Sequence, residues 1–289
     1  MRTASRSESS ETASLAGKTL IMSGGSRGIG EAIALRAAAD GANVAMIAKT
    51  AEPHPKLPGT IYTAAKAVEE AGGQALPIVG DVRDDESVAK AIEDTVARFG
   101  GIDVVVNNAS AIDLSPTEHI RMKSYDLMLD INTRGSFLLS KLSIPHLRNS
   151  DNPHILTLSP PISLDPKWFG RIGTGYTIAK YGMSLVTLGL SEELRGDGIA
   201  ANSLWPRTTI DTAAIRNVVG AELANTSRTP QIMADAAHAI ATKPAKETTG
   251  QFFIDDEVLA AAGVTDFAQY RLCEREEDLS LDLWVEGSR

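Results

Sequence analysis

The stretch that decides the fold is Ser23-Gly24-Gly25-Ser26-Arg27-Gly28-Ile29-Gly30. It leaves an apolar run and opens a segment of helical periodicity, so it joins a strand to a helix. Its glycines let the backbone approach a ligand closely, and the N-terminus of the helix offers unpaired N–H groups and a positive dipole end to a pyrophosphate. The spacing Gly-x-x-x-Gly-x-Gly departs from the commoner Gly-x-Gly-x-x-Gly, but it predicts the same dinucleotide site. The alternative is a glycine-rich turn chosen only for its backbone angles.

Outward from this loop, short apolar runs alternate with longer helical segments, as in β-α-β units of a parallel sheet. The predicted strands are Thr19 to Ser23, Asn43 to Ala48, Gln74 to Gly80, Val104 to Asn107, His154 to Leu158, Ala200 to Leu204 and Gln251 to Ile254. The predicted helices are Ile29 to Asp40, Ile61 to Ala71, Asp85 to Phe99, Ser124 to Leu147, Gly175 to Arg195 and Ala234 to Thr242. This rhythm predicts an α/β Rossmann fold, a doubly wound seven-stranded parallel sheet with helices on both faces.

Composition limits the classes of protein. The chain has 289 residues, a formal net charge of -9 and one cysteine, Cys273. Residues 1–14 are polar and predict a disordered tail, and residues 15–289 predict one domain with a substrate loop at about 207–230. An acidic chain without a long apolar run predicts neither nucleic-acid nor membrane binding. The single cysteine and the lack of a recognisable signal segment favour the cytoplasm.

Residues at the ends of the predicted strands extend the dinucleotide site. Asp81 ends the third strand, where its carboxylate can accept from an adenine amino group, or cap a helix, with Val82 beside the ring. The end of the second strand, Ala48-Lys49-Thr50, lacks the acidic residue that repels a 2'-phosphate. Lys49 and Arg27 are both cationic there, which predicts that NADP(H) is preferred over NAD(H); the alternative is that both are solvated surface charges.

A second pattern, Tyr176-Thr177-Ile178-Ala179-Lys180, puts a phenol and an ammonium on one face of a helix. A nearby cation stabilises a phenolate, so Lys180 and a positively charged oxidised nicotinamide together are expected to lower the pKa of Tyr176. The pattern alone also fits a surface pair. Ser163, thirteen residues upstream of Tyr176, and Asn132, in the long helix after Asn107-Asn108, give it a context.

These motifs together resemble the classical short-chain dehydrogenase/reductase family, over Leu15 to about Asp256. The resemblance implies that Tyr176 is the acid/base and that Ser163 polarises the substrate carbonyl. It also implies that Lys180 binds the nicotinamide ribose, in addition to its effect on Tyr176, and that Asn132 holds a water of the proton relay. Ser159 competes with Ser163 for its role. The implied cofactor-binding residues are Ser23, Gly24, Ser26, Arg27, Gly28, Ile29, Gly30, Ala48, Lys49, Thr50, Asp81, Val82, Asn108, Ala109, Tyr176, Lys180, Pro206, Thr208 and Ile210.

The chain also departs from the family pattern. Ser110 replaces a usual glycine, and Pro206-Arg207 replaces Pro-Gly, which leaves open whether Thr208 or Thr212 binds the nicotinamide phosphate. Several other segments are similar to the hydroxysteroid dehydrogenase-like protein 2 branch, whose animal members add a sterol-carrier domain that we do not expect here. They are Ser159-Pro160-Pro161, Trp168-Phe169, Leu204 to Thr208 and Gly250 to Asp255.

The expected function is the NADP(H)-dependent interconversion of a carbonyl and a secondary alcohol on an apolar lipid-, steroid- or acyl-like substrate. Trp168, Phe169 and Arg207 are the predicted substrate-pocket residues, although the two aromatics also fit an ordinary core. The histidines show no ligand spacing, so no metal site is expected. The resemblance implies a homodimer or homotetramer. The alternative function is a catalytically idle NADPH-binding sensor or interaction protein.

Overall fold

The computed structural model describes residues 13–53, 59–218 and 220–286. The predicted tail therefore lies almost entirely outside the described residues. The strands are β1 Thr19–Ser23, β2 Asn43–Ala48, β3 Gln74–Val79, β4 Val104–Asn107, β5 His154–Thr157, β6 Ala200–Trp205 and β7 Phe252–Ile254. The α-helices are α1 Gly28–Ala38, α2 Ile61–Glu70, α3 Asp85–Phe99, α4 Met122–Met128, α5 Gly135–Leu147, α6 Pro166–Ile172, α7 Thr174–Glu193, α8 Ala213–Val218, α9 Gln231–Ala241 and α10 Asp255–Ala261.

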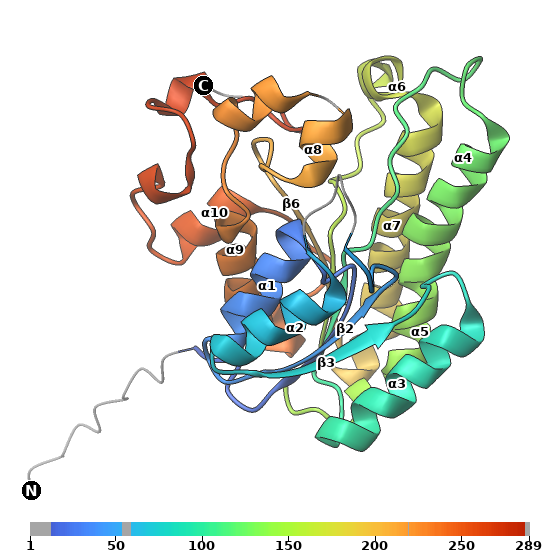
Figure 1. Ribbon diagram of the computed structural model, residues 1–289, viewed down its shortest axis with the longest axis vertical. Helices are drawn as coiled ribbons and strands as arrows, with labels where there is room; N and C mark the ends of the chain where they lie inside the picture. Colours follow the sequence, from blue (N-terminus) through green and yellow to red (C-terminus); the bar gives the residue numbers. More distant parts are fainter. Residues whose placement is uncertain (1–12, 54–58, 219, 287–289) are drawn as a thin grey trace, which may run out of the picture.

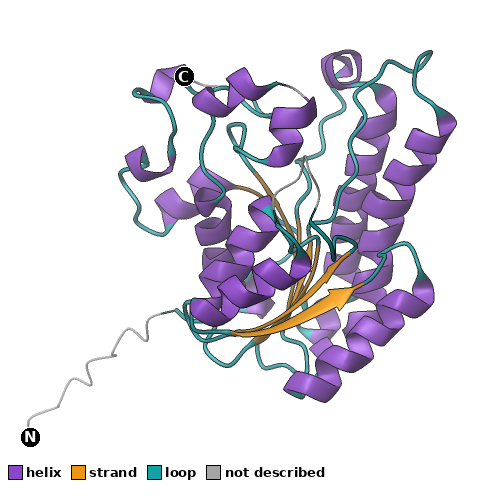
Figure 2. Ribbon diagram, in the orientation of Figure 1, coloured by secondary structure: helices purple, strands orange, loops and turns teal. Residues whose placement is uncertain are grey.

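All seven strands form one sheet in the order β3-β2-β1-β4-β5-β6-β7, with every neighbouring pair parallel. Helices cover both faces of this sheet, with α1, α2 and α9 on one side and α3, α5 and α7 on the other (Figures 1 and 2). The predicted doubly wound Rossmann fold is thus confirmed. The chain runs outward from β1 toward β3 and then returns to β4, so the carboxyl ends of β1 and β4 flank the switch point where such sheets bind ligands.

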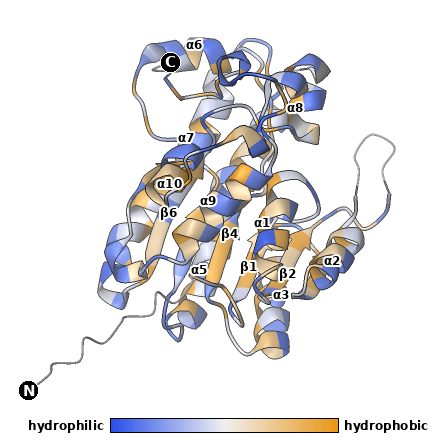
Figure 3. Ribbon diagram, turned by 90° about the vertical axis from the view of Figure 1, so that its left-hand side faces the viewer, coloured by the Kyte–Doolittle hydropathy of each residue, from blue (hydrophilic) through white to orange (hydrophobic). Residues whose placement is uncertain are grey.

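The core lies in two layers, one on each face of the sheet. The first is built by apolar residues of α1, α2 and α9, and the second by those of α3, α5 and α7. The strands are therefore apolar along their length, while the helices turn hydrophilic residues outward (Figure 3). No helix within the described residues is long and apolar enough to cross a bilayer.

The predicted helix Ser124 to Leu147 is the element that differs most from expectation. It consists of α4, a π-helical turn over Leu129–Arg134, and α5. The wide turn contains Asn132, whose side chain is fully buried and bonded to another segment. The helices α6, α8 and α10 were not predicted because each has only six or seven residues, too few for a helical period to stand out.

Candidate active site

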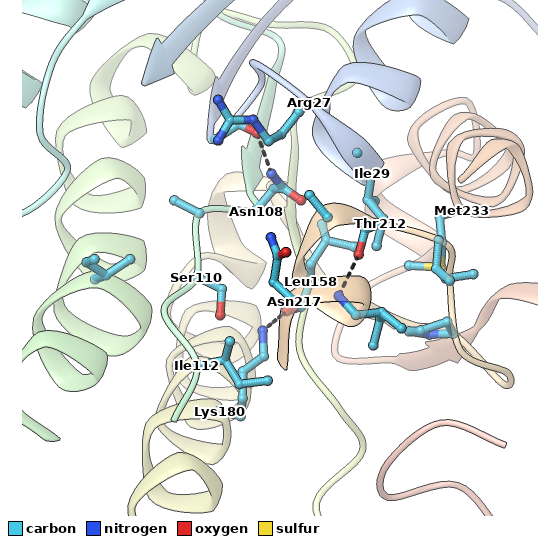
Figure 4. A pocket seen from close by; sticks show the side chains of 18 of the residues that line it. Arg27, Ile29, Asn108, Ser110, Ile112, Leu158, Lys180, Thr212, Asn217 and Met233 are labelled. Atoms are coloured by element: carbon cyan, nitrogen blue, oxygen red, sulfur yellow. Dashed lines mark hydrogen bonds between the residues drawn. The ribbon is translucent and has the colours of Figure 1, made fainter. Parts of the chain in front are cut away.

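A pocket of about 1010 Å³ opens at the carboxyl ends of β1 and β4 (Figure 4). It is continuous from the glycine loop after β1 to Tyr176 and Lys180 on α7. The predicted site residues on its wall are Gly24, Ser26, Arg27, Gly28, Ile29, Ala48, Lys49, Thr50, Asp81, Val82, Asn108, Ala109, Tyr176, Lys180, Pro206 and Ile210. Those off its wall are Ser23, Gly30, Asn132, Ser163, Trp168, Phe169, Arg207 and Thr208.

The glycine loop has the tight form that a phosphate cradle needs. Gly24 and Gly28 have φ of +73° and +59° in the left-handed region. A Cβ on Gly30 would lie 2.5 Å from the Asn108 side-chain nitrogen and from the Gly24 carbonyl oxygen. No side chain caps the N-terminus of α1, so its first N–H groups face the pocket without a capping partner. This geometry fits a dinucleotide pyrophosphate.

Ser23 and Asn108 hold the loops after β1 and β4 together. The Ser23 hydroxyl accepts hydrogen bonds from the backbone N–H groups of Asn108 and Ala109, at 3.1 and 3.0 Å. The Asn108 amide donates to the carbonyl oxygens of Ser23 and Gly24, at 3.1 and 2.8 Å. Ser23 and Gly30 thus shape the pocket from behind its wall.

Charged side chains gather where β2 and β3 end. Lys49 Nζ lies 2.7 Å from a carboxylate oxygen of Asp81, and Arg83 donates to the same carboxylate. The hydrogen bonds from Arg83, together with those from Lys49, hold the pKa of Asp81 well below its usual range although partial burial opposes them. Arg27 contributes a further positive charge on the pocket wall. In this group, the three cationic side chains of Lys49, Arg83 and Arg27 outnumber the single carboxylate of Asp81.

Tyr176 and Lys180 lie one helical turn apart on α7, and both are buried. Lys180 Nζ donates to the Leu158 carbonyl oxygen at 2.7 Å and lies 5.0 Å from the centroid of the Trp205 ring. Burial lowers the pKa of Lys180 to about 7, although the carboxyl group of Asp282 opposes this shift.

Burial raises the pKa of the Tyr176 hydroxyl well above its usual value. The charge of Asp282 adds to this shift, and a hydrogen bond with the side chain of Ser110 opposes it. The loss of water around the phenol is the largest of these effects. A lowering of the Tyr176 pKa by Lys180 together with a bound oxidised nicotinamide stays a prediction. Tyr176 keeps its proton at neutral pH.

Asn132 is positioned by the π-helical turn and is entirely buried. Its side-chain oxygen accepts from the Ala111 N–H at 2.8 Å, and its nitrogen donates to the Ala111 carbonyl oxygen at 3.0 Å. Both polar ends of the side chain are thus used to fix the segment after β4.

Neither serine that follows β5 lies on the pocket wall. The Ser163 hydroxyl accepts from the Asp165 N–H at 3.3 Å, and its backbone is bonded to the Tyr181 hydroxyl. Ser159 is fully buried and shares a 2.8 Å hydrogen bond with Ser203. The catalytic role of Ser163 stays a prediction from spacing.

The segment after β6 also differs in detail from expectation. Thr209 and Thr212 lie on the pocket wall, whereas Thr208 is buried behind it with a hydroxyl that has no partner among the described residues. Arg207 pairs with Asp256 and Glu257 on α10 and does not line the pocket.

The predicted aromatic pair lies behind the site. Trp168 is buried, and Phe169 packs edge-on against Tyr181 with 6.1 Å between ring centroids. Trp168 belongs to a buried cluster, the partly buried Phe169 packs against it, and neither is on the pocket wall. They therefore fit the alternative of an ordinary core better than a direct role in substrate contact. Trp205 and Arg171 line the pocket instead.

Residues 279–286, here called the C-terminal strap, complete the pocket and were missed from sequence. Backbone bonds tie the strap to the predicted substrate loop: Thr209 donates to the Ser280 carbonyl oxygen at 2.9 Å, and Asp282 donates to that of Arg207 at 2.9 Å. Ser280, Leu281, Asp282 and Leu283 line the pocket. The alternation Leu279-x-Leu281-x-Leu283 was the available signal, because it is typical of an extended half-buried segment.

Trp284 packs the strap against Tyr176. Its ring centroid lies 5.8 Å from that of Tyr176, 5.7 Å from that of Tyr181 and 5.5 Å from that of Trp205. Trp205 Nε1 donates to the Leu283 carbonyl oxygen at 2.8 Å. The strap thus excludes water from Tyr176 and brings Asp282, whose pKa burial raises to about 7, next to it.

Comparisons with known proteins agree with this geometry. Residues 18–222 match the family described as short chain dehydrogenase. Hydroxysteroid dehydrogenase-like protein 2 of Danio rerio is 55% identical over 96% of this chain and 66% of the relative's length; that of Homo sapiens is 51% identical over 90% of this chain and 62% of its length. The chain thus spans less than two thirds of these relatives.

Solved structures of dehydrogenases are also similar to this chain in fold and in sequence. A putative dehydrogenase from Xanthomonas campestris has a TM-score of 0.91 at 55% identity, covering 95% of this chain and 100% of that one. A short chain dehydrogenase from Mycobacterium thermoresistibile has a TM-score of 0.90 at 57% identity, covering 95% of this chain and 97% of that one.

Proposed function

Because the chain belongs to the short-chain dehydrogenase family, we propose that it is an NADP(H)-dependent oxidoreductase that interconverts a carbonyl and a secondary alcohol on an apolar substrate. The observation that carries this proposal is one continuous pocket, with a phosphate cradle at one end and the buried Tyr176 and Lys180 at the other. Asn132 supports the site by holding the backbone beside it.

In this proposal Tyr176 is the acid/base at the substrate oxygen. The bound reduced cofactor supplies the hydride. The raised pKa of Tyr176 keeps its proton in place, so that it can be donated to a carbonyl oxygen as negative charge develops there. Lys180, with a pKa of about 7, is suited to return a proton to Tyr176 and to bind the nicotinamide ribose. Protonated Tyr176 is the form that reduction of a carbonyl requires.

The preference for NADP(H) rests on the charges at the end of β2. Lys49 and Arg27 lie on the pocket wall there, and a 2'-phosphate would gain charge-assisted hydrogen bonds from them. Asp81 already pairs with Lys49 and Arg83, so it supports the arrangement of the cations. We expect a lower dissociation constant for NADPH than for NADH by titration calorimetry, with the difference reduced in Lys49→Ala. Tighter binding of NADH would overturn this preference.

The proposal of an apolar substrate is based on the remaining residues of the pocket wall. Side chains of Ile112, Leu114, Leu223, Leu281 and Leu283 line it. Apolar lining with few polar groups suits a lipid-, steroid- or acyl-like carbonyl. The test follows NADPH oxidation with a carbonyl panel graded from small polar aldehydes to hydrophobic ketones and acyl compounds, and turnover should concentrate at the hydrophobic end. Tight NADPH binding with no turnover across the panel would instead favour a sensor or interaction protein.

We also propose a homodimer or homotetramer formed through α5 and α7. Phe137 on α5 and Ile178, Leu185 and Leu188 on α7 are 41–57% exposed, although they are apolar. Light scattering should give a multiple of the chain mass, and Leu185→Glu should lower it. A monomeric wild-type protein would contradict this proposal. For location we propose the cytoplasm, which imaging of the tagged chain would test.

A further inference from the structure

We propose that Arg171 binds an anionic group of the substrate, so that the apolar substrate carries a carboxylate or a phosphate in addition to its reacting carbonyl. This inference rests on the proposed function and deepens it. The apolar pocket wall indicates a hydrophobic substrate, and the charge of Arg171 adds a second chemical feature that this substrate must have.

Arg171 lies in the last turn of α6, the short helix that precedes α7 (Figure 1). The helix ends at Gly173, which has a φ of +91°, and a Cβ there would lie 2.9 Å from the Ser115 carbonyl oxygen. The end of α6 is therefore packed closely against the segment that carries Leu114. Both Leu114 and Arg171 line the pocket, so the cation lies beside an apolar part of the wall.

The guanidinium of Arg171 is available to a ligand. The cationic side chains on the pocket wall are Arg27, Lys49, Arg171 and Lys180. The first two lie at the dinucleotide end, and Lys180 donates to the Leu158 carbonyl oxygen. Arg171 is exposed, and it makes neither a hydrogen bond nor an ion pair with any residue that the structure describes. No other group of the described chain therefore compensates its charge by direct contact.

The second cation of α6, Lys167, shows the contrast. Lys167 Nζ and the Arg171 guanidinium lie over the same Trp168 ring, 5.2 and 5.9 Å from its centroid. Lys167 pairs with Asp165 and Glu286 and does not line the pocket. Packing on a buried indole restricts the Arg171 side chain before a ligand arrives, which lowers the entropic cost of binding.

Asp282 is the carboxyl group that could compete with an anionic ligand, because it lines the pocket with Arg171. Its Oδ1 accepts from the Leu283 N–H at 2.6 Å, and it makes no ion pair with Arg171. Burial raises the pKa of Asp282 to about 7, so at neutral pH it carries only part of a negative charge. Asp282 therefore leaves Arg171 able to bind an anion.

The position of Arg171 indicates how such a substrate would lie. A guanidinium forms two parallel hydrogen bonds with a carboxylate or a phosphate. Tyr176 is only 5% exposed, whereas Arg171 is exposed, so the reacting carbonyl would lie inside and the anionic group nearer to the solvent. The apolar side chains of Ile112, Leu114 and Leu283 on the wall suit a hydrocarbon chain that joins the two groups.

The test measures binding of three probes with the same hydrocarbon chain to the NADPH-loaded protein by titration calorimetry: decanoate, decyl phosphate and the neutral decanol. We expect at least one of the two anions to have a dissociation constant about tenfold or more below that of decanol, and the tighter one identifies the anionic group.

The variants are Arg171→Met, Arg171→Lys and the matched control Lys167→Met on the same helix. Arg171→Met should abolish the preference for the anion, Arg171→Lys should retain part of it, and Lys167→Met should leave it unchanged. The dissociation constant for NADPH should stay within about threefold of wild type in all three, because Arg171 is not assigned to the cofactor.

The inference is overturned if neither anion binds more tightly than decanol, or if the preference persists in Arg171→Met. Binding and turnover separate the two proposals, since none of the probes carries a carbonyl that can be reduced. If the preference depends on Arg171 but no compound of the carbonyl panel is turned over, the anion site stands and the proposed function fails. If the panel is turned over but neither anion is preferred, the proposed function stands and the role of Arg171 fails.

Discussion

The protonation state of Tyr176 is set by its surroundings. The phenol is 5% exposed, and burial is the largest cause of its raised pKa. Asp282 adds negative charge from the C-terminal strap, whereas Lys180 directs its ammonium to the Leu158 carbonyl oxygen. A tyrosine in this environment is better prepared to donate a proton than to accept one.

This balance predicts how Asp282→Asn changes the pH dependence of activity. The charge of Asp282 raises the pKa of both Tyr176 and Lys180, so its removal should lower both. The other charged groups that act on Asp282 are Arg171 and Asp255. Because protonated Lys180, with a pKa of about 7, returns the proton to Tyr176 in the proposed reaction, the alkaline limb of the kcat profile should move to lower pH by about half a unit or more.

The matched control is Asp278→Asn, which removes a carboxylate of the same chain segment that pairs with Arg275 away from the pocket. Its profile should follow that of the wild type. An alkaline limb that is unchanged or shifted upward in Asp282→Asn would contradict the assigned influence of Asp282.

Spacing in the sequence predicted most of the pocket at the residue scale, because residues that end parallel strands meet at one edge of the sheet. It predicted Lys49, Asp81, Tyr176 and Lys180 on the wall, where they lie. It did not find Ser280, Leu281, Asp282 and Leu283, because they follow no strand of the sheet.

At the scale of elements, two segments shape this site: the C-terminal strap and the π-helical turn over Leu129–Arg134. The strap joins the substrate loop through Thr209 and Asp282 and covers Tyr176 with Trp284. The turn at Asn132 was hidden from sequence because a helix with one wide turn keeps nearly the same apolar period. The strap was hidden because it has little regular structure and lies far from the motifs in sequence.

Trp284→Ala tests the strap. The loss of a buried indole should lower the free energy of unfolding by roughly 3 kcal/mol or more. Because Leu281 and Leu283 on the same strap line the pocket, we expect the KM for the carbonyl substrate to rise about tenfold or more. Chemical denaturation and steady-state kinetics measure the two effects.

Met128→Ala is the control for stability alone, since Met128 is buried in the same cluster but does not line the pocket. It should lower stability with little change in KM. A rise in KM of the same size in both variants would mean that the strap has no particular role in substrate binding.

At the scale of the whole molecule, the sheet could be predicted almost in full. Three of the strands, Thr19–Ser23, Asn43–Ala48 and Val104–Asn107, have the predicted bounds, and the other four differ by one residue at one end. Buried parallel strands can be predicted in this way because they are short apolar runs bounded by glycine and polar residues. Contacts between distant segments could not be predicted in this way. The strap reaches the substrate loop and α7 only in the folded chain, so its alternation of leucines could indicate an extended segment but not where that segment packs.

The central claim is that Tyr176 gives a proton to the substrate in a site where the cofactor is bound independently of it. The most direct measurement is the rate of NADPH oxidation by Tyr176→Phe with saturating carbonyl substrate, next to Tyr181→Phe as a matched change on the same helix. We predict that Tyr176→Phe binds NADPH with a dissociation constant within about threefold of wild type and loses about 10²- to 10⁴-fold in kcat, while Tyr181→Phe keeps most of its activity. Wild-type turnover by Tyr176→Phe would contradict the claim.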